Sequence, residues 1–188
     1  MTTTGNRPLF DRLAVLHRPD CAAMTAPATP APDLPDAGML ARILGADEAG
    51  RYAIAARQVY EELRRLIGQL AGLLILARLT SRRDHADLAE HRTCRDRHAE
   101  AVALLARLSA PGPLGPHRAR LAESTALCGE IIDGLARWQP DAATADAEFA
   151  ALNARIRHAL GLLESCSSDK AGLQMVDFSH ACCTCGGH

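Results

Sequence analysis

Residues 47–80 read DEAGRYAIAARQVYEELRRLIGQLAGLLILARLT. Apolar or small side chains recur along this stretch, mostly in steps of three and four residues, at Tyr52, Val59, Leu63, Leu66, Leu70, Leu73 and Ala77. Such steps place side chains on one face of a helix and are typical of a helix packed in a bundle. We therefore expect a long amphipathic helix here, with Asp47 as its N-cap.

Three further helical segments follow the first one. They run over residues 84–109, over residues 116–138, and from the end of the segment QPDAAT (139–144) to Cys166. The prolines and glycines of APGPLGP (110–116) enforce a turn between two of them. Apolar residues make up 48% of the chain and aromatic residues only 3%, with alanine and leucine dominating the apolar set. The pattern predicts an all-α fold, an up-and-down antiparallel four-helix bundle.

The segments around this helical body differ from it in composition. Residues 1–24 include a short amphipathic stretch, Leu9 to Leu16, that is a candidate docking peptide. Residues 25–38 form a Pro/Ala linker, since proline removes helical hydrogen bonds. We expect the bundle to occupy residues 39–166, and a loop with an irregular Cys/His-rich tail to occupy residues 167–188. Within the last of these, LQMVDF (173–178) is expected to form a short strand or a single turn.

Charge and hydropathy exclude several classes of protein. Twenty-one basic and 22 acidic side chains give a net charge of -1, so no overall field attracts nucleic acid. The most apolar stretch, residues 70–79, is too short to span a bilayer, and the first residues lack the pattern of a signal peptide. We expect a cytoplasmic protein that binds neither nucleic acid nor membrane, with thiols that stay reduced.

The chain ends in SHACCTCGGH, residues 179–188, which concentrates three of the seven cysteines and two of the eight histidines. Thiolate and imidazole are the ligands preferred by copper and zinc. The candidate metal ligands are Cys182, Cys183, Cys185 and His188, with His180 as a further candidate. Gly186 and Gly187 allow the chain to fold His188 back toward the sulfur atoms.

Other interpretations of the tail remain open. Adjacent cysteines beside histidines also suit thiol-disulfide exchange. The last ten residues are similar to the Cys/Thr-rich cores of ribosomally made precursor peptides, although this body is far longer than usual leaders and no double glycine precedes the cysteines. The tail would then be the substrate of a partner enzyme.

The second helical segment places polar side chains on its apolar stripe, which we expect to run through Leu88, His91, Cys94 or Arg95, His98, Val102 and Leu105. In an antiparallel bundle, Cys94 and Cys128 lie about 15 Å from the same end and can face each other. Gln69 and Asn153 fall near the same layer. His91, Cys94, His98 and Cys128 are thus a candidate second metal site, although a structural role is the stronger interpretation. Cys166 and His117 are expected near the opposite end of the bundle.

The function that these residues favour is binding of a soft metal, copper or zinc, by a non-enzymatic carrier or sensor. No glycine-rich dinucleotide loop is present, and the glutamates lack the Glu-x-x-His pairs of carboxylate di-iron bundles. A protein partner is expected, and pairing of two copies through the long first helix is left open. The alternatives are a carrier or precursor whose tail is modified by an enzyme, and an adaptor that docks through Leu9 to Leu16.

Overall fold

A computed structural model describes residues 29–80 and 88–175 of the chain. Within these residues, five α-helices and one short 3-10 helix form the structure, and no β-strand is present. The helices are α2 (Ala37–Leu44), α3 (Ala46–Thr80), α4 (Ala89–Arg107), the 3-10 helix η2 (Gly112–Leu114), α5 (Gly115–Arg137) and α6 (Ala145–Ser165). The prediction of an all-α protein is confirmed.

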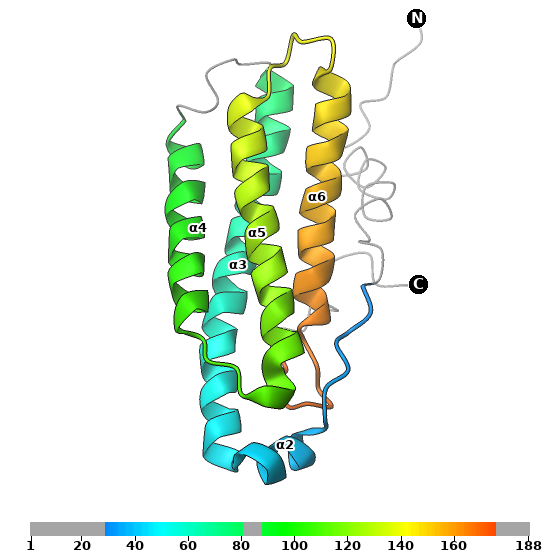
Figure 1. The fold of residues 1–188 in the computed structure, drawn as a ribbon. Coiled ribbons are helices and arrows are strands. Elements are labelled where there is room, and N and C mark those ends of the chain that lie inside the picture. Colours follow the sequence, from blue (N-terminus) through cyan, green and yellow to red (C-terminus); the bar gives the residue numbers. More distant parts are fainter. Residues whose placement is uncertain (1–28, 81–87, 176–188) are drawn as a thin grey trace, which may run out of the picture.

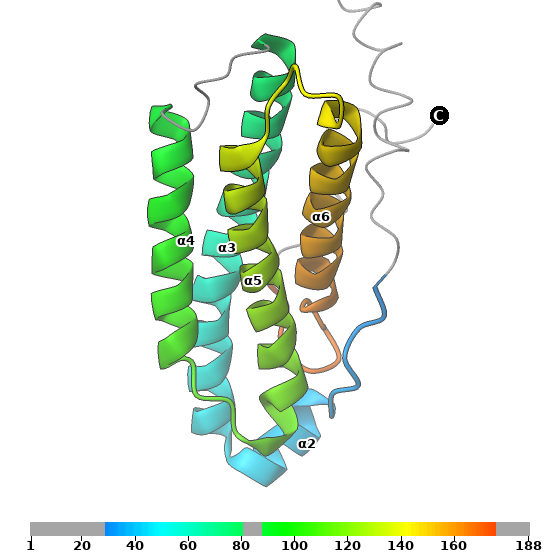
Figure 2. The same ribbon diagram turned by 45° about the horizontal axis from the view of Figure 1, so that its top comes forward.

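The four long helices, α3 to α6, lie side by side with their axes nearly aligned (Figures 1 and 2). Each runs in the opposite direction to the one before it, and α2 crosses the end of the body where α3 begins. Helix α5 packs against α6, α3 and α4, while α3 also packs against α4 and α6. A continuous core of mostly aliphatic side chains, with two tyrosines and a tryptophan, lies between these helices.

Helix α3 follows the apolar pattern of its sequence. All seven side chains of the predicted stripe are buried in the core. The helix begins at Ala46, so the prediction of Asp47 as the N-cap was wrong. Asp47 and Glu48 instead lie in the first turn, where carboxylates interact favourably with the helix dipole. Gly45, with a φ of 86°, separates α2 from α3 in a backbone conformation that glycine tolerates best.

Helix α2 is an element that the sequence pattern did not predict. Its N-cap is Asp36, whose side chain accepts a hydrogen bond of 2.8 Å from the backbone N–H of Met39. The helix has only eight residues, and its first two belong to the stretch expected to be linker. Leu40 is its buried residue and joins the core.

The remaining helices end within a few residues of the expected positions. Helix α4 is described from Ala89, because its predicted start at Asp84 lies outside the described residues. Its apolar stripe passes through Ala101, which is fully buried, and not through Val102, which is 45% exposed. The prediction for Val102 was therefore wrong. The seam continues from His98 by a step of three residues, where a step of four was expected.

The chain after α6 folds back onto the body. Ser168 and Leu173 exchange two backbone hydrogen bonds, of 3.1 and 2.9 Å, as an isolated antiparallel bridge. Leu173 and Met175 are buried, and the carbonyl of Lys170 accepts a hydrogen bond from the N–H of Ala37. The described part of LQMVDF thus belongs to a turn that closes the same end as α2.

Candidate functional site

Two histidines of α4 contact the backbone of α5. His91 Nε2 lies 3.2 Å from the carbonyl oxygen of Ile132, and His98 Nε2 lies 3.1 Å from that of Thr125. A carbonyl oxygen can only accept, so each Nε2 carries a proton and donates it. Seven residues separate the histidines and seven separate the carbonyls, in the opposite order along the chain. The two contacts therefore define one antiparallel register between α4 and α5.

This register brings Cys94 and Cys128 to the same level of the body. Cys94 follows His91 by three residues and Cys128 precedes Ile132 by four, so their levels differ by one residue, about 1.5 Å along a helix axis. Their exposed fractions are 1% and 0%. The sequence prediction of a common level was counted from a helix start at Asp84, which lies outside the described residues; in the structure the common level follows from the two histidine contacts.

The environment of the two thiols keeps them protonated at neutral pH. Burial raises the pKa of Cys94, and the nearby charge of Arg97 opposes part of that rise. Burial, with a further contribution from Cys94, raises the pKa of Cys128 to about 12. Because Cys94 contributes to the raised pKa of Cys128, the two thiols lie within electrostatic range of each other.

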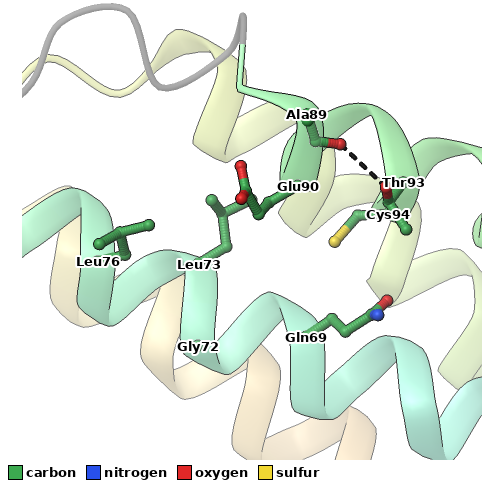
Figure 3. Close-up of a pocket in the computed structure, with 8 residues that line it drawn as sticks. All are labelled: Gln69, Gly72, Leu73, Leu76, Ala89, Glu90, Thr93 and Cys94. Atoms are coloured by element: carbon green, nitrogen blue, oxygen red, sulfur yellow. Dashed lines mark hydrogen bonds between the residues drawn. The ribbon is translucent and has the colours of Figure 1, made fainter.

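A groove between α3 and α4 leads to Cys94 (Figure 3). We call it the α3–α4 groove; its volume is about 370 Å³, within the usual range of small-ligand pockets. It is lined by Gln69, Gly72, Leu73, Leu76, Ala89, Glu90, Thr93 and Cys94. In Figure 3 the sulfur of Cys94 and the carboxylate of Glu90 point into the space between the two helices.

Two features of the sequence open this groove. Gly72 has no side chain, and a Cβ placed there would meet nothing within 4 Å. Thr93 turns its hydroxyl away to its own helix, donating a hydrogen bond of 3.0 Å to the carbonyl of Ala89. Gln69 lies beside Cys94 in the groove wall, as expected from the polar layer, whereas Asn153 of α6 is half-buried and does not line the groove.

The thiols are the part of the candidate internal metal site that the structure brings together. Residues 29–80 and 88–175 contain no group of three or more His, Cys, Asp or Glu side chains placed to hold a metal ion. His91 and His98 direct Nε2 to carbonyls of α5, which leaves Cys94 and Cys128 as the pair. The predicted tail ligands Cys182, Cys183, Cys185, His188 and His180 lie outside the described residues.

A second buried polar cluster lies near the other end of the body. His117, fully buried in α5, has its Nε2 2.9 Å from the carbonyl oxygen of Cys166 and its Nδ1 2.7 Å from the hydroxyl of Tyr52. Nε2 donates to the carbonyl, so in the neutral ring Nδ1 accepts from the tyrosine hydroxyl. Burial lowers the pKa of His117, while its hydrogen bond to Cys166 opposes that change. Both ring nitrogens of His117 thus have a hydrogen-bond partner, as is typical of a structural histidine.

Sequence reasoning overlooked four residues of these sites. Tyr52 was assigned only to the apolar stripe, although its hydroxyl holds His117. Glu90 was not named with Cys94, yet residues four apart share one helix face, so this spacing carried the signal. Thr93, which is adjacent to Cys94 in the chain, was not named either. Gly72 lies opposite them on α3.

Neither a protein-family model, nor a curated protein, nor a solved structure matches this chain. Its function is accordingly inferred from its own residues. Among the helices of the described residues, none is long and apolar enough to cross a membrane.

Proposed function

We propose that this protein is a non-enzymatic carrier or sensor that binds copper or zinc through its C-terminal Cys/His segment. The observation that carries the proposal is the concentration of Cys182, Cys183, Cys185, His180 and His188 within nine residues. Thiolates favour Cu(I) and Zn(II), and an imidazole completes the shell. His188 serves as that imidazole, with His180 available in its place.

The helical body supports this proposal as a scaffold. We infer that α3 to α6 form an up-and-down antiparallel four-helix bundle, an arrangement that carries a terminal segment on a stable core. The buried Leu173 and Met175 tie the chain to this core four residues before Ser179. The segment that follows therefore departs from a fixed point on the body.

Metal analysis tests the tail directly. The full chain, purified without chelator, is compared with a chain that ends at Ser179 and with a full-length variant carrying Cys182→Ser, Cys183→Ser and Cys185→Ser. We expect copper or zinc in the full chain and a lower metal content in both altered chains. Equal metal content in all three would overturn the proposal. The triple variant separates loss of the thiols from loss of the chain end.

A second candidate rests on the order of residues in the tail. Three cysteines with a threonine and two glycines follow a separately folded body, which suits a segment presented to a modifying enzyme. Intact mass of the protein made together with its genomic neighbours distinguishes the two functions. A mass equal to that encoded by the gene argues against modification.

Partner and location form part of the same proposal. Delivery or sensing of a metal requires a protein partner in the cytoplasm, and two copies can pair through α3. Mass spectrometry under native conditions reports bound metal, covalent change and oligomeric state together. Removal of residues 1–24, which leaves Leu34, Asp36 and Ala37 in place, should abolish partner binding and leave metal content unchanged if residues 9–16 form the docking peptide.

A further inference from the structure

The two buried thiols of α4 and α5 share their level and their neighbourhood. The contacts of His91 and His98 with α5 set the register that places Cys94 beside Cys128. Both helices also pack against α3, whose Gln69 and Gly72 line the groove above Cys94. A small ion in the α3–α4 groove therefore reaches Cys94 directly, and Cys128 lies at the same level on the neighbouring helix α5.

We propose that Cys94 and Cys128 form an internal two-sulfur site for Cu(I), entered through the α3–α4 groove. This site is independent of the C-terminal segment. In the binding step, Cu(I) forms one bond to each sulfur while both S–H bonds break and two protons leave to solvent. No oxidant or reductant takes part, because copper stays monovalent and both sulfurs remain at the thiolate oxidation level.

The number and kind of ligands select the metal. Cu(I) is a soft ion that thiolates prefer, and two thiolates suffice to hold it. Zinc sites in proteins are almost always tetrahedral, and no third His, Cys, Asp or Glu among the described residues completes such a set here. The side chains of His91 and His98 stay on the α5 carbonyls, where they hold the two helices in register.

A positive charge near the two thiols suits the negative charge of the copper complex. A Cu(I) ion bound by two thiolates carries one net negative charge in a buried place, which is unfavourable without a nearby cation. Arg97, one turn along α4, already acts on the Cys94 thiol in the direction that favours its anionic form. Its guanidinium is held in place by a 2.8 Å ion pair with Glu62 of α3.

The test uses the full-length chain in which Cys182, Cys183 and Cys185 are changed to serine. Cu(I) is titrated without oxygen against the chromophoric chelator bicinchoninate. We expect uptake of one Cu(I) per chain, and an affinity at least about tenfold weaker after Cys94→Ala or Cys128→Ala, since each removes one of two bonds to the metal. The matched control is Cys166→Ala. Cys166 is also buried, but it lies at the C-terminal end of α6, away from the layer of Cys94 and Cys128, so this change should leave the affinity unchanged.

Two outcomes overturn the proposal: no uptake by the tail-substituted parent, or equal affinity in Cys94→Ala, Cys128→Ala and Cys166→Ala. Thermal unfolding by circular dichroism verifies that each variant is folded. If an alanine variant does not fold, copper X-ray absorption of the parent decides, with sulfur as the sole first neighbour expected and nitrogen or oxygen neighbours contradicting the site. The reciprocal chain, with the tail cysteines intact and Cys94→Ala plus Cys128→Ala, tests the tail alone, so failure of either site is distinguishable.

Discussion

At the scale of single residues, His117 is held in one protonation state by its two partners. The hydroxyl of Tyr52 donates to Nδ1, and the carbonyl of Cys166 accepts from Nε2. A second proton on the ring would have to bind Nδ1, at the position that the tyrosine hydroxyl proton occupies. Burial independently disfavours the charged ring and lowers its pKa. The folded protein therefore keeps His117 neutral at pH values where an exposed histidine is charged.

This predicts a loss of stability in mild acid. The pKa of His117 in the folded state lies below the value of 6.5 that is typical of an unfolded chain. The stability that neutral His117 contributes is thus fully present above pH 6.5, and it falls as the pH drops from 6.5 toward the lowered folded pKa, because the unfolded chain binds the proton first. Denaturant unfolding at pH 8, 6.5 and 5.5 should show a steeper fall for the natural chain than for His117→Asn. Parallel pH profiles would contradict this account.

The hydroxyl of Tyr52 gives a second prediction at the same scale. Tyr52→Phe removes the donor to Nδ1 and leaves a buried acceptor unsatisfied, which should lower the free energy of unfolding by about 1–3 kcal/mol. The same change in a His117→Asn background should cost less, because the partner atom is already altered. Both costs are measured by denaturant unfolding. Equal costs in the two backgrounds would mean that the Tyr52 hydroxyl does not stabilise the protein through its hydrogen bond with His117.

At the scale of helices, close packing of α5 on α6 depends on a missing side chain. A Cβ added at Gly134 would lie 2.5 Å from Cδ2 of Leu152, a buried side chain of α6. Gly68 of α3 is exposed, and a Cβ there would meet nothing within 4 Å. Changing each glycine to alanine therefore separates the effect of packing on stability from the effect of helix propensity.

We expect opposite results from these two glycines. Gly68→Ala should raise the free energy of unfolding by about 0.5–1 kcal/mol, since alanine favours the helix. Gly134→Ala gains the same propensity but forces Leu152 to move, and should leave the protein about 1–3 kcal/mol less stable than Gly68→Ala. Thermal and urea unfolding of the two variants decide the matter. A Gly134→Ala protein as stable as Gly68→Ala would show that Leu152 yields freely.

The buried stripes of the helices could be predicted from the sequence only in part. The buried stripe of α3 could be predicted because its apolar or small side chains recur on one face. The stripe of α4 was predicted less well, since Ala101 and Val102 both fit an apolar position and only packing against the other helices selects Ala101. Helix α2 was missed because the four prolines of the expected linker precede it and it spans little more than two turns.

The candidate sites show the same limit. Cys94 and Cys128 could be predicted to share a layer from the rise per residue of two antiparallel helices, although the helix start used for that count, Asp84, lies outside the described residues. The contacts of His91 and His98 with α5 carbonyls could not be predicted, since a backbone partner leaves no trace in residue identity. Gly72 helps to open the groove above Cys94, but the local spacing of α3 and α4 on which it also depends cannot be predicted from any single residue.

At the scale of the whole molecule, the two ends of the described chain close the same end of the body. The N–H of Ala37, the first residue of α2, donates a 2.9 Å hydrogen bond to the carbonyl of Lys170. A Cβ placed at Gly172, whose φ is 68°, would lie 3.2 Å from the Cβ of Ala37, so the two segments are in close contact. Leu34, Ala171 and Leu173 belong to the same core cluster. The segment after α6 is therefore part of the folded body up to Met175.

This contact predicts different results for two truncations. A chain ending at Cys166 loses the buried Leu173 and Met175, and should be about 3–6 kcal/mol less stable than the full chain, since burial of each such side chain contributes about 1.5–3 kcal/mol. A chain ending at Ser179 keeps both side chains and should match the full chain within about 0.5 kcal/mol, as expected for changes away from the core. Denaturant unfolding of the three proteins provides the measurement. Equal stability of the chains ending at Cys166 and at Ser179 would refute the role of this segment. The chain ending at Ser179 keeps the core intact, so metal lost from it reports on the tail ligands. Metal lost from the chain ending at Cys166 also reports on unfolding.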